Sequence, residues 1–174
     1  DVLRNINFIE GSNFADTITG STALIFEQIE GLGGNDVLNG GVVTDPLNND
    51  NANRVSYRFA TAGVVVDLAA GTALTTNATI TGSSGNDTLS NFTQVRGSNF
   101  NDTLYGSDTT TFTELFEGLN GNDVIDGRGG FDIVRYDGAT GGEAEGQGAG
   151  HGVFGEGVFH QGSAHGHVPV GVDM

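Results

Sequence analysis

The sequence predicts an all-β protein with glycine corners, in which successive turns stack as in a solenoid. Three observations support this prediction. Six nine-residue units share one template, with glycine first, aspartate sixth and an aliphatic residue eighth. The β-prone pairs that follow each aspartate suit strands of only a few residues between glycine turns. No segment has convincing helical periodicity, and the best candidate, Phe112 to Glu117, would form at most a turn or two.

The repeated unit is the strongest signal in the chain. The units begin at Gly11, Gly31, Gly82, Gly97, Gly118 and Gly127; their aspartates are Asp16, Asp36, Asp87, Asp102, Asp123 and Asp132; their aliphatic residues are Ile18, Leu38, Leu89, Leu104, Ile125 and Val134. Such units bury their apolar side chains only when neighbours stack. We therefore expect the aliphatic residues to form a thin core between the stacked turns.

Two longer segments also predict strands. Arg54 to Phe59 alternates apolar Val55, Tyr57 and Phe59 with polar residues, which predicts one buried and one exposed face. Gly63 to Leu68 is rich in β-branched residues and is the strongest strand candidate in the chain.

A duplication organises the chain. Residues from Asp1 onward align with residues from Asp87 onward, which predicts a repeat region over 1–141 in two unequal copies, about 1–80 and 81–141. The first copy has an additional polar loop at 44–52. Because Asp1 aligns with the sixth position of a unit, we expect the chain to start inside a longer array. Residues 142–174 form a Gly- and His-rich tail that we expect to be flexible.

The composition limits the classes of partner that the chain can bind. The formal net charge is −16, with no lysine, so nucleic acid is an unfavourable partner. There is no cysteine and no apolar run long enough for a transmembrane segment. A disulfide-free acidic chain needs another stabilising element, and a bound metal ion is the usual one.

The repeated loop has the chemistry of a calcium site. Calcium takes six to eight hard oxygen ligands. Glycine permits backbone turns that point carbonyl groups inward, and the aspartate supplies charge. One loop is too short to complete the coordination shell, so two stacked loops would share an ion. Binding and stacking would then be one event.

The units resemble the GGxGxDxUx nonapeptide repeats of RTX, or haemolysin-type calcium-binding, proteins. The resemblance covers roughly residues 1–140. It implies a parallel β-roll in which calcium lies between successive loops, held by aspartate carboxylates and by backbone carbonyls near the glycines. It also implies export, usually by type I secretion, to calcium-rich surroundings outside the cell. The candidate metal residues are Asp16, Gly31, Gly33, Asn35, Asp36, Gly85, Asp87, Asp102, Gly118, Asn120, Asn122, Asp123, Gly127, Gly129 and Asp132.

The units also depart from that motif. The second glycine is replaced by Ser, Leu or Arg in every unit, and Phe14 and Phe100 replace the fourth glycine in two units. For Asp16 and Asp102, metal binding and a structural corner therefore both stay open. We expect calcium to concentrate at Asp36, Asp123 and Asp132, in the loop Gly31–Leu38 and the tandem pair Gly118–Val134.

These features predict a non-enzymatic, calcium-folded structural module of a larger secreted or cell-surface protein of the adhesin, surface-layer or matrix type. Two alternatives are an export and folding appendage of a secreted hydrolase, and a calcium-dependent carbohydrate-binding module. The partners are calcium ions and neighbouring repeats of the parent chain. Edge strands could also pair end to end into fibres or layers.

Overall fold

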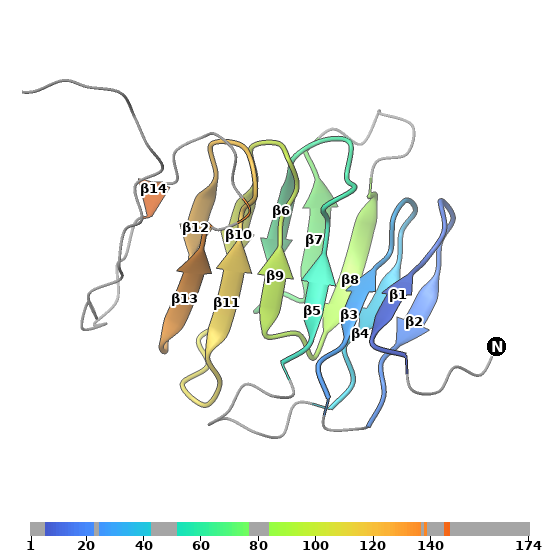
Figure 1. The fold of residues 1–174 in the computed structure, drawn as a ribbon, viewed down its shortest axis with the longest axis horizontal. Coiled ribbons are helices and arrows are strands. Elements are labelled where there is room, and N and C mark those ends of the chain that lie inside the picture. The colour runs from blue at the N-terminus through green and yellow to red at the C-terminus, as the bar shows by residue number, and fades with distance from the viewer. Residues whose placement is uncertain are drawn as a thin grey trace, which may run out of the picture.

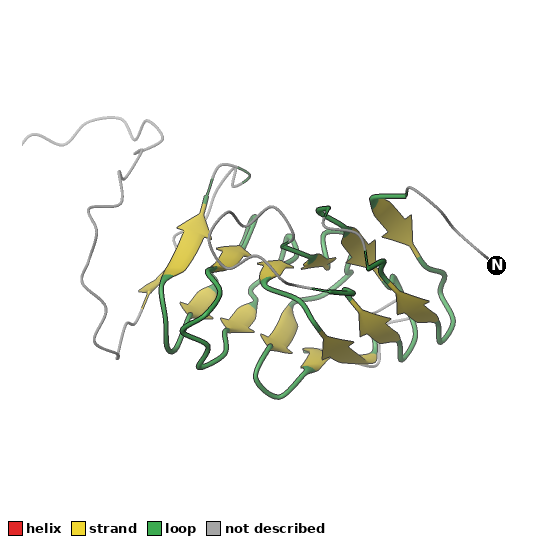
Figure 2. Ribbon diagram, turned by 90° about the horizontal axis from the view of Figure 1, so that it is seen from below, coloured by secondary structure: helices red, strands yellow, loops and turns green. Residues whose placement is uncertain are grey.

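The computed structural model describes residues 6–22, 25–42, 52–76, 84–136 and 138, and the backbone of 145–146. The described part of the chain is all-β and contains no helix, which confirms the all-β part of the predicted fold class. Its strands form two sheets that face each other as two layers (Figures 1 and 2). The strands are β1 Phe8–Glu10, β2 Thr17–Thr19, β3 Gln28–Glu30, β4 Val37–Asn39, β5 Arg54–Ser56, β6 Val64–Asp67, β7 Thr72–Thr75, β8 Asn86–Ser90, β9 Gln94–Arg96, β10 Thr103–Tyr105, β11 Glu114–Glu117, β12 Val124–Asp126, β13 Asp132–Arg135 and β14 Glu145–Gly146.

The chain alternates between the two sheets. The six-stranded sheet has the order β1-β3-β5-β9-β11-β13, and the eight-stranded sheet has the order β14-β12-β10-β6-β7-β8-β4-β2. Each of β1, β3, β9, β11 and β13 is followed by one strand of the other sheet, and we call each such pair a rung. Neighbouring rungs pair in parallel and in register, for example Leu104 with Ile125. Strand β14, which lies beyond residue 141, continues this pairing on β12. The rest of 142–174 lies outside the described residues.

Strand β7 departs from parallel pairing. It is antiparallel to both β6 and β8, whereas every other described strand pair is parallel. Only Leu68 to Gly71 separate β6 from β7, and a parallel return needs a crossover of a dozen or more residues. Gly71 has a φ of 67°, which suits this tight reversal. A short meander, β6 to β8, is therefore inserted into the eight-stranded sheet where the first copy meets the second.

The core lies between the sheets and uses the repeated aliphatic position. Leu38 and Leu104 are fully buried, and Leu89 and Ile125 are 5% exposed. The six-stranded sheet contributes Ile29, Val55, Val95 and Phe116, all fully buried. Val134, in contrast, is 40% exposed, so its predicted core position is wrong: β13 is the last strand of its sheet and lacks a neighbour on one side.

Two other predictions for the six-stranded sheet are wrong. Residues Glu114–Glu117 form strand β11 and not a helical turn, because they pair in parallel with β9 and β13. Of the face expected to be buried, Val55 and Tyr57 are buried as predicted, but Phe59 is 55% exposed. Arg54 and Ser56 of the opposite face are buried as well.

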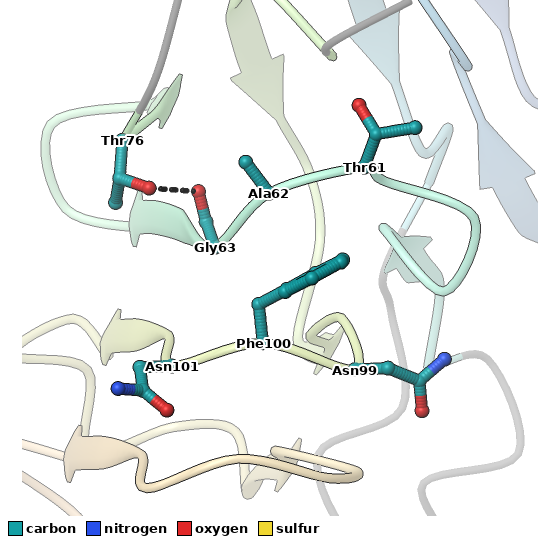
Figure 3. A pocket seen from close by; sticks show the side chains of 7 residues that line it. All are labelled: Thr61, Ala62, Gly63, Thr76, Asn99, Phe100 and Asn101. Carbon is teal, nitrogen blue, oxygen red and sulfur yellow. Dashed lines mark hydrogen bonds between the residues drawn. The ribbon is translucent and has the colours of Figure 1, made fainter. Parts of the chain in front are cut away.

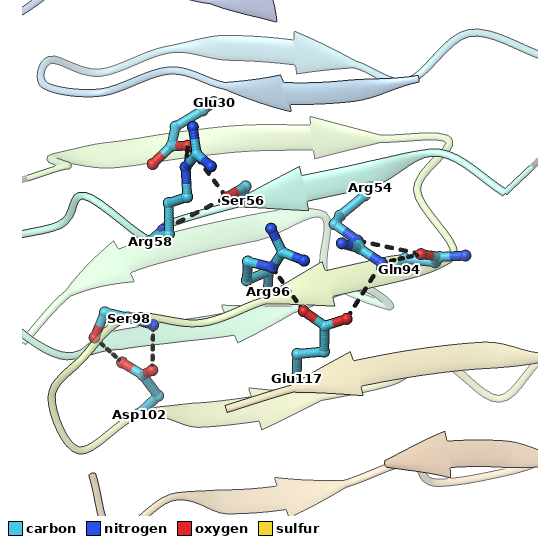
Figure 4. A network of polar contacts seen from close by, with 9 residues as sticks. All are labelled: Glu30, Arg54, Ser56, Arg58, Gln94, Arg96, Ser98, Asp102 and Glu117. Atoms are coloured by element: carbon cyan, nitrogen blue, oxygen red, sulfur yellow. Dashed lines mark hydrogen bonds and ion pairs between the residues drawn. The ribbon is translucent and has the colours of Figure 1, made fainter. Parts of the chain in front are cut away.

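An ion-pair network on the six-stranded sheet explains the buried polar residues (Figure 4). Arg54 donates to Gln94 Oε1 at 2.9 and 3.2 Å and lies 3.4 Å from Glu117. Arg96 Nε donates to Glu117 Oε2 at 2.6 Å. Arg58 Nε lies 3.3 Å from Glu30 Oε2. These arginines link β5, β9 and β11 with their own positive charges, so this part of the stack contains a cross-link that needs no metal ion.

Candidate metal centre

The glycine-rich units form turns at two opposite edges of the stack. Turns that lead from the six-stranded to the eight-stranded sheet form the first edge, at the top of Figure 1, and include the Gly11, Gly31, Gly97 and Gly118 units. Turns that lead back form the second edge and include the Gly127 unit, because β13 belongs to the six-stranded sheet.

Aspartates connect neighbouring rungs along the first edge. Each Oδ1 accepts a hydrogen bond from a backbone N–H on or just before the neighbouring strand of the eight-stranded sheet. Asp36 Oδ1 accepts from Asp16 N, Asp87 from Asp36 N and Asp123 from Asp102 N, each at 2.9 Å, and Asp102 accepts from Val64 N at 2.8 Å. These bonds define two columns of carboxylates, one through Asp16, Asp36 and Asp87 and one through Asp102 and Asp123, with β7 between them.

The first glycine of each unit makes room for the aspartate of the same unit. A Cβ atom on Gly31 would overlap Asp36 Oδ2, and one on Gly118 would overlap Asp123 Oδ2. At Gly127 the Cβ would meet Asp132 Oδ2. The spacing from the first to the sixth position therefore has a steric cause: the carboxylate occupies the space of the missing side chain.

The glycine-rich loops share a backbone conformation that the other two lack. Their second and fourth residues have positive φ: Leu32 69° and Gly34 125°, Leu119 72° and Gly121 130°, Arg128 60° and Gly130 115°. No residue of 11–16 or 97–102 has a positive φ. Leucine and arginine adopt this region only at a cost of about 1–3 kcal/mol. The replacements of the second glycine therefore retain the backbone that glycine would adopt.

In the two loops without these turns, serine side chains satisfy the aspartates. Asp16 Oδ2 accepts from Ser12 N at 2.6 Å and from Ser12 Oγ at 2.9 Å. Asp102 accepts from Ser98 N at 2.5 Å and from Ser98 Oγ at 2.7 Å (Figure 4). These carboxylates have internal donors in place of a cation, which favours the structural corner among the two alternatives left open for them.

In the glycine-rich loops, carboxylate oxygens are left without donors. Asp36 is 1% exposed, and its Oδ2 is buried without a hydrogen-bond partner among the described residues. Asp132 Oδ1 is in the same situation. Burying a charged oxygen without a partner is costly, and a hard cation removes that cost. Asp123, 5% exposed, has the same position over its glycine. These carboxylate oxygens are thus ligands that fit calcium.

Asp87 and Gly85 lie next to the Gly31 loop in the first column. Asp87 Oδ2 accepts from the hydroxyl of buried Tyr57 at 3.0 Å, so both of its oxygens have donors. Gly85 has a φ of 72° and packs against the backbone of Gly34. Asn86 N donates to Asn35 Oδ1 at 3.0 Å, which places Asn35 between the loops.

The tandem loops Gly118 and Gly127 do not stack on each other. The Gly118 loop stacks on the Gly97 loop: Asn122 N donates to Asn101 Oδ1 at 2.9 Å, and Asn120 Nδ2 donates to Asn99 Oδ1 at 2.7 Å. The Gly127 loop stacks on the turn at Ser107, since Gly129 N donates to Ser107 O at 3.2 Å. Nine residues make only half a rung, so consecutive units lie at opposite edges.

The sequence analysis did not predict that two glutamates on the second edge accept hydrogen bonds from backbone N–H groups. Glu27 Oε2 accepts from Ser21 N at 2.7 Å, and Glu114 Oε2 accepts from Ser107 N at 2.8 Å. Both glutamates are buried. The signal was present as a Gly-Ser pair at equivalent points of the two copies, 20–21 and 106–107, but a template that requires aspartate does not detect it.

Comparison with protein families decides the identity of the loops. The model of the RTX calcium-binding nonapeptide repeat matches four segments, residues 27–45, 74–90, 94–110 and 108–138. These segments are RTX calcium-binding repeats. Calcium is therefore the metal that these repeats imply. A search of curated proteins gave no match. No helix long and apolar enough to cross a membrane occurs among the residues that the structure describes.

One cavity interrupts the RTX loops on the first edge (Figure 3). It has a volume of about 470 Å³ and is lined by Thr61, Ala62, Gly63, Thr76, Asn99, Phe100 and Asn101. It lies where the connection from β5 to β6 takes the place of a glycine-rich loop beside the Gly97 loop. Half-exposed Phe100 and two asparagines give it one aromatic and several polar groups.

Burial raises the pKa of the RTX carboxyl groups. It raises the pKa of Asp87 to about 7 and that of Asp102 to about 6. The pKa of Asp132 is raised to about 6, first by burial and then by the nearby charge of Glu114. Burial also raises the pKa of Asp36 and Asp123. In the metal-free fold these groups therefore bind protons at a higher pH than an exposed aspartate does.

We expect acid to stabilise the metal-free fold. A carboxyl group whose folded-state pKa exceeds its unfolded value binds more protons in the folded state, so the free energy of unfolding decreases as pH rises. For Asp87, Asp102 and Asp132 this stabilisation is fully present below about pH 3.8 and is lost as pH rises through about 6 to 7. Circular dichroism in calcium-free buffer should show more β signal at pH 5 than at pH 8. More β signal at pH 8 would contradict this account.

Proposed function

We propose that this chain is a calcium-folded β-roll module of a larger secreted or cell-surface protein. One observation carries the proposal: the glycine-rich loops at Gly31 and Gly127 each leave a buried carboxylate oxygen without a donor, whereas the serine-containing loops supply donors. The same fold position thus occurs in an internally satisfied form and in a form that needs a cation. Alternation of the chain between two sheets with parallel, in-register rungs supports the β-roll.

In this proposal the aspartates of the glycine-rich loops hold the ions. Asp36, Asp123 and Asp132 supply charge, and the backbone at Gly31, Gly33, Gly118, Gly127 and Gly129 shapes the loops around them. Calcium supplies the positive charge that the acidic columns lack. Each aspartate also accepts an N–H from the next rung or lies in register with it, so the residues that hold an ion also join the rungs. Ion binding and rung stacking therefore stabilise each other.

A calcium titration tests the proposal. We expect circular dichroism to show a largely disordered chain in EGTA and a β-rich chain in millimolar calcium. Each site at ten times its dissociation constant contributes about 1.4 kcal/mol, so a few sites match a substantial part of a small domain's stability. Magnesium at the same concentration is the control, because it demands a smaller octahedral site and dehydrates reluctantly. An identical β signal in EGTA and in calcium would refute calcium-dependent folding.

The biological role we infer is structural: the module is exported loosely folded and becomes rigid in calcium outside the cell. Residues 1–141 are the repeat module in this proposal, with 142–174 as an appended tail. An appendage of a secreted hydrolase would have the same physical properties, and the other domains of the parent protein distinguish these roles. The carbohydrate-binding alternative is supported by the cavity beside Phe100, and glycan-array binding with and without calcium tests it.

A further inference from the structure

A row of oxygen-bearing side chains follows the second edge, where the strands of the six-stranded sheet begin. The hydrogen bonds Arg54 N to Glu27 O at 2.9 Å, Thr93 N to Asn53 O at 3.1 Å and Leu115 N to Thr93 O at 3.0 Å set the register. Glu114 pairs directly with Asp132. In-register residues of parallel strands point to the same face of the sheet. This second-edge row consists of Glu27, Asn53, Thr93, Glu114 and Asp132.

The row is buried except for half-buried Asp132, and it contains oxygens that lack partners. Asn53 is 1% exposed and Thr93 6% exposed. Asn53 Oδ1, Thr93 Oγ1 and Asp132 Oδ1 are buried without a hydrogen-bond partner among the described residues. Glu114 is 2% exposed, and its carboxylate accepts from Ser107 N and Oγ, both at 2.8 Å. A hydroxyl and an amide oxygen without partners are costly in a buried position, which points to a missing ligand.

A cavity lies beside this row. It has a volume of about 170 Å³ and is lined by Asn91, Phe92, Thr93, Ser107, Thr109, Phe112 and Glu114. Thr93 and Glu114 thus both line this space, between the turn that precedes β9 and the turn that precedes β11. The buried hydroxyl oxygen of Thr93 lies on the residue that separates this space from the row. A single ion or a few water molecules fit such a volume.

The charge around this cavity is negative. Glu114 interacts electrostatically with Asp132 and Asp108, and Asp132 also with Asp126. The nearby cation is Arg128, which is bound to Asp67 through two bonds of 2.6 and 2.9 Å and to Gly106 O at 2.8 Å. The guanidinium group of Arg128 is thus committed to Asp67, and the carboxylates beside the cavity still attract a cation.

We propose that this cavity is an additional calcium site, of a different kind from the glycine-rich loops. Thr93 Oγ1 and the Glu114 carboxylate hold a divalent cation between two rungs, with Asn53 and Asp132 on either side of them in the row. Hydroxyl, amide and carboxylate oxygens are the hard ligands that calcium prefers. The proposal rests on calcium binding by the module, and it adds ligands from residues that lie outside the matched repeat segments, Asn53 and Thr93.

Replacement of Thr93 by valine distinguishes a hydroxyl that binds calcium from a hydroxyl that has no ligand. The two cases predict opposite changes in the calcium concentration at half-folding. We expect Thr93→Val to raise the calcium concentration at half-folding severalfold and to lower the ion count in native mass spectrometry by one. Glu114→Gln, which keeps the shape of the side chain and removes its charge, should lose the same ion. Ser56→Ala is the control: its buried hydroxyl donates to Glu30 at 3.2 Å, away from the row, so the ion count should be unchanged.

The contrary outcome is equally distinct. If the cavity holds only water, valine removes an unsatisfied hydroxyl, so Thr93→Val lowers the calcium concentration at half-folding and the ion count stays the same. That result would overturn the additional site and leave the glycine-rich calcium loops intact. A wild-type chain that binds no calcium ions would instead overturn the proposed function itself.

Discussion

Replacing Gly118 with alanine is expected to lower the free energy of unfolding in saturating calcium by about 1–3 kcal/mol, the usual cost of forcing an extra carbon into a packed site. The new Cβ would occupy the position of Asp123 Oδ2, so the carboxylate must leave its place over the loop. Both calcium binding and the bond from Asp102 N to Asp123 Oδ1 depend on that place. Urea unfolding in saturating calcium measures the change.

Gly129→Ala is the matched control, since this glycine lies in a loop of the same type. A Cβ there would meet Asp108 at 3.4 Å and beyond, which is ordinary van der Waals contact. We expect a loss of well under half of that seen for Gly118→Ala. Equal losses for the two variants would show that the effect comes from glycine content in general and not from the space that the carboxylate needs.

Asp36→Asn is expected to remove one bound ion and about 1.4–2.7 kcal/mol of stability in calcium, the contribution of one site at ten to a hundred times its dissociation constant. Asparagine keeps an oxygen that can accept from Asp16 N, so the rung contact at 2.9 Å is retained while the charge is lost. In calcium-free buffer the sign reverses: the variant should retain more β signal, because a buried carboxylate without a partner has been neutralised. Native mass spectrometry and circular dichroism measure the two effects.

The comparison with Asp16→Asn makes this prediction specific. Asp16 already accepts from Ser12 N and Ser12 Oγ, so its replacement should leave the ion count unchanged. Loss of an ion from Asp16→Asn and not from Asp36→Asn would mean that the internally satisfied loop is the metal site, and the assignment of the two loop types would be reversed.

The repeat template predicted the parts of the fold that depend on local spacing. Gly31 and Asp36 lie together because the carboxylate fills the space over the glycine, and Leu38 is buried because the strand after the aspartate points inward. Both relations are set within nine residues. They could therefore be predicted from one unit without knowing which unit is its neighbour.

The arrangement of the units could not be predicted in this way. Asp123 and Asp132 are nine residues apart and yet lie at opposite edges, because one unit is half a rung. The direction of β7 depends on the short connection Leu68 to Gly71, and the burial of Arg54 depends on Gln94 and Glu117 from other rungs. These features come from contacts between rungs, and the periodicity of one strand contains no information about them.

The difference between the loop types was visible in the sequence but could not be interpreted there. Ser12 and Ser98 occupy the second position of their units, where Leu32, Leu119 and Arg128 stand in the glycine-rich loops. Only the hydrogen bonds of the serines to their aspartates show that this residue provides internal donors.

The most direct test of the account is a crystal structure grown in millimolar calcium, with anomalous differences used to place the ions. We predict calcium beside Asp36, Asp123 and Asp132, where the glycine-rich loops leave room for the carboxylates and where Asp36 and Asp132 have oxygens without donors. We predict none held by the serine-bonded oxygens of Asp16 and Asp102. Ions at those two serine-bonded carboxylates, with none beside Asp36 and Asp132, would contradict the account.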